Sequence, residues 1–312
     1  MSKKSKPTSL IEAIRYFSDL DVCTEYVAKL RWPEGPVCPA CGCMEYSYLT
    51  TRRVWKCKAC KKQYSVKVGT VFEESRLGLD KWLPAVWLVA NSKNGVSSHA
   101  LGRSLGVTQK SAWFMLHRIR LAMQQGGIVM AGEVEIDETF VGGKVGYMKR
   151  EARERRGITR KGGLGEHKVA VMGFKERNTG RVQAQVIPDA KGATLKPIVA
   201  EKVKDGSTVY TDHWSGYTGL EGRFTHETVN HVERYVEGRV HTNGIENFWA
   251  LLKRGLNGTY VSIDPSHPFR YVDERVFTFN ERGLTDLGRF STVLGRISGL
   301  RLTYTDLIAE PS

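Results

Sequence analysis

Four cysteines in two C-x-x-C pairs constrain the fold of this chain more than any other feature. The segment VCPAC supplies Cys38 and Cys41, and the segment WKCKAC supplies Cys57 and Cys60. Fifteen residues separate the pairs, a spacing typical of a zinc ribbon, in which two tight turns present four thiolates to one tetrahedral ion. The segments YSYLTTRRVWK and KQYSVKVGTVF are rich in β-branched and aromatic residues and predict hairpin strands. We therefore expect a ribbon at residues 35–72 with a structural Zn²⁺, because four thiolates leave no open coordination position.

Other uses of these cysteines fit the pattern less well. A disulfide pair or a thioredoxin-like redox motif is an alternative, but two repeated pairs in a reduced compartment favour metal binding. Cys43 could replace Cys41 as a ligand, although the C-x-x-C spacing favours Cys41. Cys23 lies in an earlier helical segment, and we expect it to be a small core residue.

The net charge indicates a polyanionic partner. The 312 residues carry a formal net charge of +14, and nucleic acid is the commonest partner of such a basic protein, although positive charge can also serve solubility. Hydrophobic residues make up 41% of the chain and aromatic residues 10%, as in globular proteins. No apolar run approaches the roughly 18 residues of a membrane span. We expect no membrane partner, a cytoplasmic location and a helical segment at residues 1–34, since no secretory apolar core follows the basic N-terminus.

Residues 78–127 have the apolar periodicity of helices. LDKWLPAVWLVAN predicts one helix, and VSSHALGRSLGVTQKSAWFMLHRIRLAMQ predicts two more, joined by a tight turn at Gly106 with Thr108 capping the second. A short helix, a glycine turn and a second helix are typical of a helix-turn-helix DNA-binding motif, although an ordinary helical hairpin has the same pattern. The residues expected to contact DNA from the second helix are Gln109, Lys110, Ser111 and Arg118.

Residues 130–285 predict a mixed sheet with flanking helices. GEVEIDETFVGG predicts a strand, an N-T-G turn joins HKVAVMGFKER to RVQAQVIPDA in a hairpin, and STVYTDHW and THETVNH predict two further strands. GATLKPIVAEKV and HTNGIENFWALLKRG predict helices before the fourth strand and after the fifth. This order is that of an RNase H-like fold, so the chain as a whole is expected to be a multidomain α+β protein. In that fold Asp137, Asp212 and Glu246 would converge and offer the hard oxygen ligands that two Mg²⁺ or Mn²⁺ ions need.

Each of these carboxylates also has a purely structural interpretation. Asp137 can end a strand at a turn, and Asp212 can form an Asx-type turn. Asn243 and Glu246 fit a relaxed capping box, in which Glu246 only closes the start of a helix. The agreement of all three with one topology favours a catalytic role. The helical wheel does so too, since Glu246 and Lys253 share a face that differs from the apolar stripe.

Several longer motifs run through the chain, namely RWPEGPVCPACG, EIDETFVGGK, VYTDHWSGY, HTNGIENFWALLKRGLNGTY, FRYVDERVFTFNER and RLTYTDLI. With these motifs the chain resembles bacterial insertion-sequence transposases of the ISXO-like group, which join an N-terminal zinc ribbon to a DDE domain. The resemblance covers about residues 10–308. It implies that Asp137, Asp212 and Glu246 are the DDE carboxylates and that Lys253 is an auxiliary basic residue. Some members of the group have Asn at the third acidic position, which makes Asn243 a rival of Glu246.

The segment 144–168 is strongly basic and rich in glycine. It carries nine Lys or Arg residues and three Glu, with little apolar periodicity. It is either a solvated loop or a clamp on the DNA backbone inserted after the first catalytic strand, and the two interpretations are compatible. The further basic residues expected to contact DNA are Lys149, Arg150, Arg153, Arg155 and Arg156 in this segment and Arg254 on the helix that carries Glu246.

Together these observations predict a DNA transposase of an insertion sequence. It would bind the terminal inverted repeats of its element, cleave the element ends and join the freed 3′-hydroxyl to target DNA. Its partner would be double-stranded DNA in the bacterial nucleoid, with a homo-oligomer assembled on that DNA. The alternatives are a zinc-ribbon and helix-turn-helix regulator without catalysis, and a nuclease of the same fold that does not join strands. Residues 286–312 are expected to form a C-terminal tail.

Overall fold

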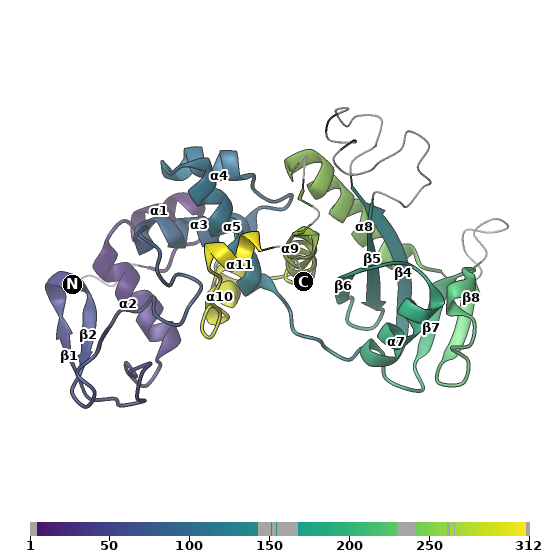
Figure 1. The fold of residues 1–312 in the computed structure, drawn as a ribbon, viewed down its shortest axis with the longest axis horizontal. Helices are drawn as coiled ribbons and strands as arrows, with labels where there is room; N and C mark the ends of the chain where they lie inside the picture. The colour runs from purple at the N-terminus through teal and green to yellow at the C-terminus, as the bar shows by residue number, and fades with distance from the viewer. Residues whose placement is uncertain are drawn as a thin grey trace. The chain divides into compact units, whose positions relative to one another are not determined.

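The protein consists of two compact units. The first unit combines Met1–Met123 with Gly283–Ser312, and the second unit is Gln124–Arg282. A three-stranded sheet, a five-stranded sheet and many helices are present (Figure 1), which confirms the predicted α+β class. The computed structural model describes residues 5–142, 151, 154, 168–229, 241–260, 263–264 and 266–309.

The first unit is built around helix α3, which is buried along most of its length. The ring of Phe290 lies 5.5 Å from that of Phe17 and 5.1 Å from that of Trp87, measured between centroids. None of the helices in the described part of the chain combines the length and apolarity that a membrane crossing requires. The helices described in this unit are α1 (Leu10–Tyr16), α2 (Leu20–Arg31), α3 (Leu79–Asn91), α4 (Ser98–Leu105), α5 (Gln109–Met123), α10 (Asp286–Gly295) and α11 (Tyr304–Ile308).

Residues 286–309, which the sequence placed in a C-terminal tail, form helices of the first unit. Helix α10 packs against α3, and Arg289 Nε donates to Asn91 Oδ1 at 2.8 Å. A β-bridge pairs Thr70 with Ser298. Phe290 of this segment is buried against Trp87 and Phe17, which lie 203 and 273 positions earlier, and a local pattern cannot identify such partners.

The predicted zinc ribbon is a small antiparallel sheet with aromatic residues on it. Trp32 lies 5.3 Å from Trp55 and 5.9 Å from Tyr64 between ring centroids. These rings therefore form the small core of the ribbon, which accounts for the aromatic content of the segments that predicted hairpins. The strands, in their order in the sheet, are β1 (Tyr46–Leu49), β2 (Val54–Cys57) and β3 (Gln63–Tyr64).

Helices α4 and α5 pack against each other across a short turn. Ser97 caps α4, because its Oγ accepts from the backbone N of Ala100 at 3.1 Å. Gly106 ends α4 with a φ of 65°, a conformation that favours glycine. Thr108 Oγ1 accepts from the backbone N of Ser111 at 3.2 Å and caps α5. The predicted pair of helices and both of its turn residues are confirmed.

The second unit contains a mixed sheet with the strand order β6-β5-β4-β7-β8. Strand β5 runs antiparallel to β4 and β6, whereas β7 runs parallel to β4 and β8. This is the strand order of an RNase H-like fold, and each strand lies within the segment that was predicted to form it. The bounds are β4 (Glu133–Val141), β5 (Val169–Glu176), β6 (Val182–Ile187), β7 (Thr208–Asp212) and β8 (Thr225–Val229).

Helices cover both faces of this sheet (Figure 1). Successive residues of a strand point to opposite faces, so Val134 and Ile136 of β4 pack with α7, while Glu135 and Asp137 face α8. The second face therefore carries acidic residues where a buried strand would ordinarily be apolar. The helices are α7 (Gly192–Lys202) on the first face, and α8 (Asn243–Gly255), followed by a π-helical turn (Leu256–Tyr260), and α9 (Pro268–Asn280) on the second.

Candidate active site and zinc site

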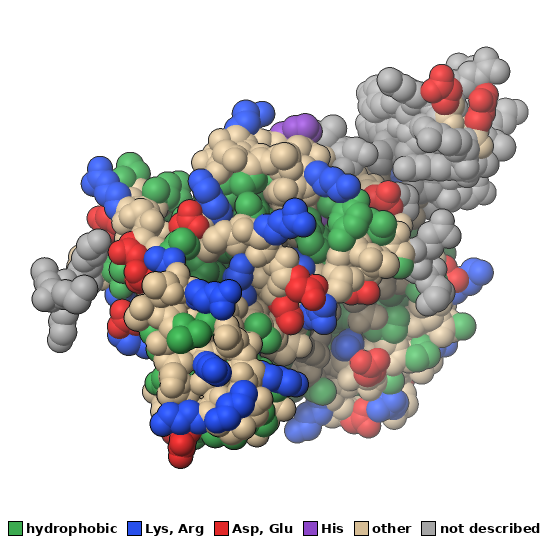
Figure 2. Space-filling view, turned by 60° about the vertical axis from the view of Figure 1, so that its left-hand side comes forward, with side chains coloured by type: hydrophobic (Ala, Val, Ile, Leu, Met, Phe, Trp, Pro, Cys, Tyr) green, Lys and Arg blue, Asp and Glu red, His purple; other side chains and the backbone are tan. Residues whose placement is uncertain are grey.

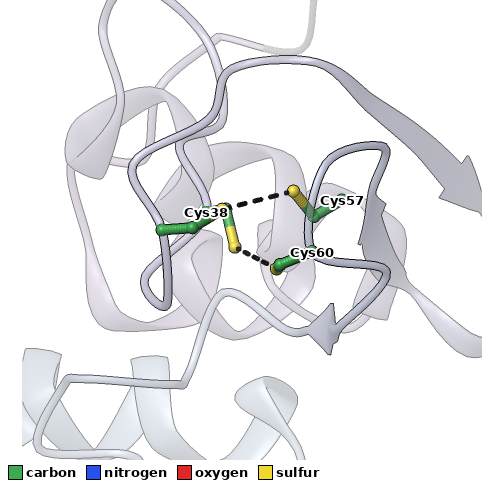
Figure 3. A group of neighbouring side chains, drawn as sticks. Cys38, Cys57 and Cys60 are labelled. Atoms are coloured by element: carbon green, nitrogen blue, oxygen red, sulfur yellow. Dashed lines mark hydrogen bonds between the residues drawn. The ribbon is translucent and has the colours of Figure 1, made fainter.

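The four thiols of the zinc ribbon converge on one point, and Figure 3 shows three of them, those of Cys38, Cys57 and Cys60, turned toward one another. Cys38 Sγ lies 3.6 Å from Cys60 Sγ, and Cys41 Sγ lies 3.6 Å from Cys57 Sγ. All four sulfur atoms lie within 4.8 Å of one another. Thiolates at about 2.3 Å from a tetrahedral zinc ion are about 3.8 Å apart. The donor set and its spacing therefore fit Zn²⁺.

The backbone of the two C-x-x-C turns holds these thiols in place. Cys38 N donates to Cys43 O at 3.0 Å, and Gly42 N donates to Cys38 O at 2.9 Å. Gly42 has a φ of 73°, which a glycine adopts without strain. In the second turn the backbone N–H of Cys60 lowers the pKa of Cys57 to about 6. This donor favours the thiolate form, which is the form that binds metal.

The two remaining cysteines lie outside the four-sulfur group. Cys43 Sγ accepts from the backbone N of Glu45 at 3.3 Å, and Cys41 rather than Cys43 belongs to the group. Cys23 is fully buried and donates to Phe17 O at 3.1 Å. Burial raises the pKa of Cys23 to about 12. Cys23 is therefore a core residue, as the sequence indicated.

Asp137 lies in the middle of β4 and faces α8. Trp249 Nε1 donates to Asp137 Oδ2 at 2.8 Å. The indole fits there because Gly173 lies opposite Asp137 on β5, and a Cβ at Gly173 would lie 2.4 Å from the Trp249 ring. Burial raises the pKa of Asp137 to about 6; the Trp249 hydrogen bond opposes this shift, and the charges of Asp212 and Glu246 add to it. The three predicted carboxylates therefore interact electrostatically.

Asp212 is the last residue of β7. The parallel pairing of β4 with β7 ends at Glu135 and Tyr210, and Asp137 and Asp212 each lie two residues beyond this pair on the two neighbouring strands. Both then point to the same face, because each is two residues from a paired position. Asp212 Oδ1 also accepts from the backbone N of Trp214 at 3.2 Å. Strand β7 therefore ends with a carboxylate on the same sheet face as Asp137, and the charge of Asp212 contributes to the raised pKa of Asp137.

Glu246 is an exposed residue in the first turn of α8. The hydroxyl of Thr242, which is the N-cap residue, donates to Glu246 Oε1 at 3.1 Å. Asn243 is the first helical residue, and the N-cap side chain accepts no bond from a helix N–H. The capping-box alternative for Asn243 and Glu246 is therefore wrong, because the helix begins one residue earlier than that pattern requires.

Lys253 and Arg254 are both exposed near the C-terminal end of α8. Glu246 and Lys253 are two turns apart and lie on a different face from the buried stripe, as the helical wheel predicted. A carboxylate and an ammonium group are thereby presented on one exposed side of the helix. The buried stripe consists of Ile245, Phe248, Trp249 and Leu252.

The carboxylates are less tightly gathered than the cysteines. In the part of the chain that the structure describes, the four cysteines are the one set of possible ligands whose atoms all lie within 4.8 Å. Asp137, Asp212 and Glu246 are all described, so at least one of the distances between their oxygens is longer than this. Anionic carboxylates repel one another, and a common cation would reduce that repulsion.

Glu138 is an acidic residue that the sequence pattern did not single out. It points to the face of β4 opposite Asp137, where the hydroxyl of Tyr217 donates to Glu138 Oε1. Burial raises the pKa of Glu138 to about 8; the Tyr217 hydrogen bond opposes this shift, and Asp137 and Asp212 add to it. The alternation of β4 was the available signal, since two adjacent acidic residues in a strand cannot face the same side.

Three of the residues predicted to contact DNA from α5 lie at its N-terminal end. Gln109 and Lys110 are exposed, and Ser111 is half-buried. Gln109 Nε2 donates to Ser98 Oγ at 2.8 Å, and Lys110 Nζ lies 4.7 Å from the centroid of the Tyr304 ring. These contacts orient the side chains while leaving the exposed Gln109 and Lys110 accessible to a ligand.

The predicted DNA contact through Arg118 is wrong. Its side chain is only 4% exposed. The guanidinium donates to Leu302 O at 2.9 Å, to Val71 O at 3.1 Å and to Glu73 O at 2.7 Å. Burial lowers the pKa of Arg118. The C-terminal segment returns to cover this part of α5, so Arg118 stabilises the first unit and does not face a ligand.

Most of the basic segment that was predicted to clamp DNA lies outside the described residues. Lys149, Arg150, Arg153, Arg155 and Arg156 lie outside them. On the face shown in Figure 2, Lys and Arg side chains are spread widely, with Asp and Glu side chains between them. Among the described residues on this face, positive side chains are therefore interspersed with negative ones.

The fold and the two sites define a protein with a zinc ribbon and an RNase H-like domain, and known proteins share both parts. Residues 129–280 match the ISXO2-like transposase domain, and residues 19–63 match the transposase zinc-ribbon domain. The chain is 33% identical over 245 residues to an uncharacterized protein in transposable element ISH50 of Halobacterium salinarum, covering 74% of this chain and 81% of that protein. It is 39% identical over 101 residues to an uncharacterized transposase-like protein of Haemophilus influenzae, covering 32% and 81%. The chain therefore belongs to the family of ISXO2-like insertion-sequence transposases.

Proposed function

We propose that this transposase cleaves DNA at the ends of its element and transfers the freed strand to target DNA, with Asp137, Asp212 and Glu246 as its catalytic carboxylates. The observation that carries the proposal is the parallel β4–β7 pairing, which ends at Glu135 and Tyr210, two residues before Asp137 and Asp212 on the same sheet face. Glu246 comes from the helix on the same sheet face, and both Asp212 and Glu246 raise the pKa of Asp137. Carboxylates from three separate elements on one sheet face are typical of a divalent-metal site for phosphoryl transfer.

The donor set fits Mg²⁺ or Mn²⁺, because these hard cations prefer carboxylate oxygens. Burial raises the pKa of Asp137, and the like charges of Asp212 and Glu246 add to the shift. Held by Asp137, Asp212 and Glu246, the cations would lower the pKa of an attacking water and neutralise charge on the leaving oxygen. Zinc in the ribbon would have a structural role only, since four thiolates complete its coordination.

The chain's own groups would bind and orient the DNA end. Trp249 donates to Asp137 and fixes the orientation of that carboxylate. Lys253, exposed on the same side of α8 as Glu246, is suited to hold a phosphate near the carboxylates. Water would attack the phosphodiester first, and the freed 3′-hydroxyl would attack target DNA second. The two steps are the same in-line displacement, so one set of groups serves both.

DNA recognition would fall to the first unit. We infer that α4 and α5 act as a helix-turn-helix motif, with Gln109, Lys110 and Ser111 at the start of α5 facing the DNA. The basic segment 144–168 and Arg254 would add contacts to phosphates. A homo-oligomer would bring two element ends together, and double-stranded DNA in the bacterial cytoplasm would be both the ligand and the substrate.

Cleavage of a labelled duplex that carries the terminal inverted repeat tests this proposal, and the DNA that flanks the gene supplies the repeat sequence. We expect Mg²⁺- or Mn²⁺-dependent nicking at the element end and joining of the 3′ end to a target plasmid. Asp137→Asn and Asp212→Asn should abolish both reactions without weakening binding to the repeat. Nicking without joining would indicate a nuclease, and specific binding with neither reaction would indicate a regulator.

A further inference from the structure

We propose that Glu135 is a positioning residue that ties the start of α8, and with it Glu246, to the strand that carries Asp137. The proposal rests on the proposed function, in which Asp137 and Glu246 belong to one site. Glu135 lies two residues before Asp137 on β4 and points to the same face of the sheet. It is not one of the three candidate ligands, so its position in a buried strand needs another explanation.

The carboxylate of Glu135 is deeply buried and fully engaged. Its side chain is 1% exposed, and a buried charge is tolerated only when it is paired and hydrogen-bonded. Oε1 accepts from Arg177 Nε at 2.9 Å, and Oε2 accepts from the backbone N of Ile245 at 2.9 Å. His241 Nδ1 lies 3.6 Å from Oε1. One carboxylate thus connects β4, the residue after β5 and both sides of the start of α8.

The bond to Ile245 takes the place of a helix cap. Ile245 is the third residue of α8. The N–H groups of a first turn lack the i−4 acceptors of later turns, and the Ile245 N–H is shared between Thr242 O at 3.1 Å and Glu135 Oε2 at 2.9 Å. The N-cap residue, Thr242, provides no side-chain bond to these groups. Glu135 accepts one of them from a neighbouring strand, and its negative charge also suits the positive end of the helix dipole. The position of the start of α8 is therefore set by β4.

Arg177 connects the same elements from the other side of Glu135. Its guanidinium lies 3.8 Å from the centroid of the Tyr210 ring on β7. The guanidinium also donates to the backbone O of His241. The backbone N of Arg177 donates to Glu133 O at 2.9 Å. Strand β7 ends at Asp212, two residues after Tyr210. The Glu135–Arg177 pair thereby reaches all three elements that carry the candidate carboxylates.

Gly244 allows the start of α8 to approach the sheet this closely. A Cβ at Gly244 would lie 2.6 Å from Glu135 Oε2 and 2.0 Å from Lys175 Nζ. Lys175 could move, because its Nζ is the end of a flexible chain, whereas Glu135 is buried and held by two bonds. A side chain at position 244 would therefore push the start of α8 away from Glu135.

The substitution Glu135→Gln tests the proposal, because it keeps the shape of the side chain and an acceptor for Ile245 while removing the charge that pairs with Arg177. Glu274→Gln is the matched control. Glu274 lies on α9, is fully buried, pairs with Arg275 and accepts from the Tyr260 hydroxyl at 2.5 Å. Both variants lose a buried charge pair in the second unit, but only Glu135→Gln alters the start of α8.

Two measurements are made on each folded variant. Binding of Mn²⁺ is followed by the paramagnetic resonance of the free ion, and nicking of the terminal-repeat duplex is followed as a function of Mn²⁺ concentration. We expect Glu135→Gln to weaken Mn²⁺ binding and to raise the half-saturating concentration by about tenfold or more, with repeat affinity unchanged. Glu274→Gln should change neither metal value. Equal shifts in both variants, or no shift in Glu135→Gln, would overturn the positioning role.

Gly244→Ala provides a second test if Glu135→Gln does not fold at the assay temperature. It displaces the same junction without removing a charge, and we expect the same loss of Mn²⁺ affinity. Unchanged Mn²⁺ binding in folded Gly244→Ala would contradict the proposal. Asp137→Asn separates the two hypotheses. If it binds Mn²⁺ and nicks as the parent does, the proposed function fails, whereas an inactive Asp137→Asn beside an unaltered Glu135→Gln removes only the positioning role.

Discussion

Individual buried carboxyl groups of the second unit differ in what each one contacts. Glu135 is paired with Arg177 and hydrogen-bonded to the backbone. Glu138 is buried against a tyrosine hydroxyl, and its pKa is raised to about 8. Burial raises the pKa of Asp273 on α9 to about 7, and the charge of Arg270 opposes the shift only in part. The buried surroundings of Glu138 and Asp273, more than their residue type, raise the pKa values of these two carboxyls.

Asp273 should make the second unit less stable as the pH rises. An unfolded Asp has a pKa of about 3.9, so between about pH 4 and the folded pKa of about 7 the folded protein holds one more proton than the unfolded chain. The free energy of unfolding therefore falls across this range and levels off above it. Asp273→Asn should remove this slope and raise the free energy of unfolding at pH 8 by about 1–3 kcal/mol.

Urea unfolding of parent and variant at pH 4.5 and pH 8 checks this prediction. The two proteins should be nearly equally stable at the lower pH and should differ at the higher one. If the variant and the parent have the same free energy of unfolding at pH 8, ionisation of Asp273 does not destabilise the folded protein, and the prediction is contradicted.

At the scale of elements, the zinc ribbon is the part that most needs a ligand. Its three strands contain ten residues in total, and a sheet of that size buries too little apolar surface to fold alone. The aromatic contacts of Trp32, Trp55 and Tyr64 provide the rest of its core. Metal binding to the four thiols is therefore expected to supply much of the folding free energy of this element.

Cys57→Ser should unfold the ribbon and release its zinc. A hydroxyl is a far weaker zinc ligand than a thiolate, and structural zinc contributes folding free energy directly. We expect one zinc per parent chain by metal analysis under reducing conditions and much less than one in Cys57→Ser. Cys43→Ser is the control, since Cys43 lies outside the four-sulfur group; loss of zinc from this control would contradict the ligand assignment.

The start of α5 should contribute a phosphate contact through Lys110. Each such contact releases about one counterion from DNA, so Lys110→Ala should weaken binding and reduce the salt slope by about one unit. Lys29→Ala is a matched control, because Lys29 is an exposed lysine on α2 that pairs with Glu25. Fluorescence anisotropy with terminal-repeat DNA at several salt concentrations measures both. Equal slopes for parent and Lys110→Ala would exclude Lys110 from the interface.

The sequence predicted most elements but few of the contacts between them. Cysteine spacing and strand alternation are local signals, and they correctly indicated the ribbon, the five strands and their order. Arg118 was misassigned because its acceptor Leu302 lies 184 residues away. The periodicity of a helix does not show which distant segment covers one of its residues. Glu135 was missed for the same reason, since its contact with Ile245 spans 110 residues.

At the scale of the whole molecule, the chain leaves the first unit at Met123 and returns to it at Gly283. The second unit is therefore inserted into the first, and the first unit is complete only when its C-terminal helices are in place. Phe290 on α10 is fully buried between Phe17 and Trp87. The resulting stability of the zinc-ribbon unit depends on residues at both ends of the sequence.

Phe290→Ala should destabilise the first unit by about 3–5 kcal/mol, because it removes a buried ring and leaves a cavity among aromatic residues. The second unit should keep its stability, since it has separate hydrophobic cores. Guanidinium unfolding followed by zinc release reports on the first unit, and unfolding followed by near-ultraviolet circular dichroism reports on both. A loss of less than about 1 kcal/mol would mean that α10 is not needed by this unit.

Glu246→Gln is the most direct test of the proposed catalytic site. Gln can still accept a hydrogen bond from Thr242, and α8 is capped by Glu135, so the variant should fold, keep its zinc and bind the terminal repeat as the parent does. It removes one anionic ligand, so metal-dependent cleavage and joining should fall by orders of magnitude, as in Asp137→Asn and Asp212→Asn. The decisive measurement is the rate of Mg²⁺-dependent nicking by folded Glu246→Gln. A rate near that of the parent, with both aspartate variants inactive, would contradict the assignment of Glu246 and direct attention to Asn243.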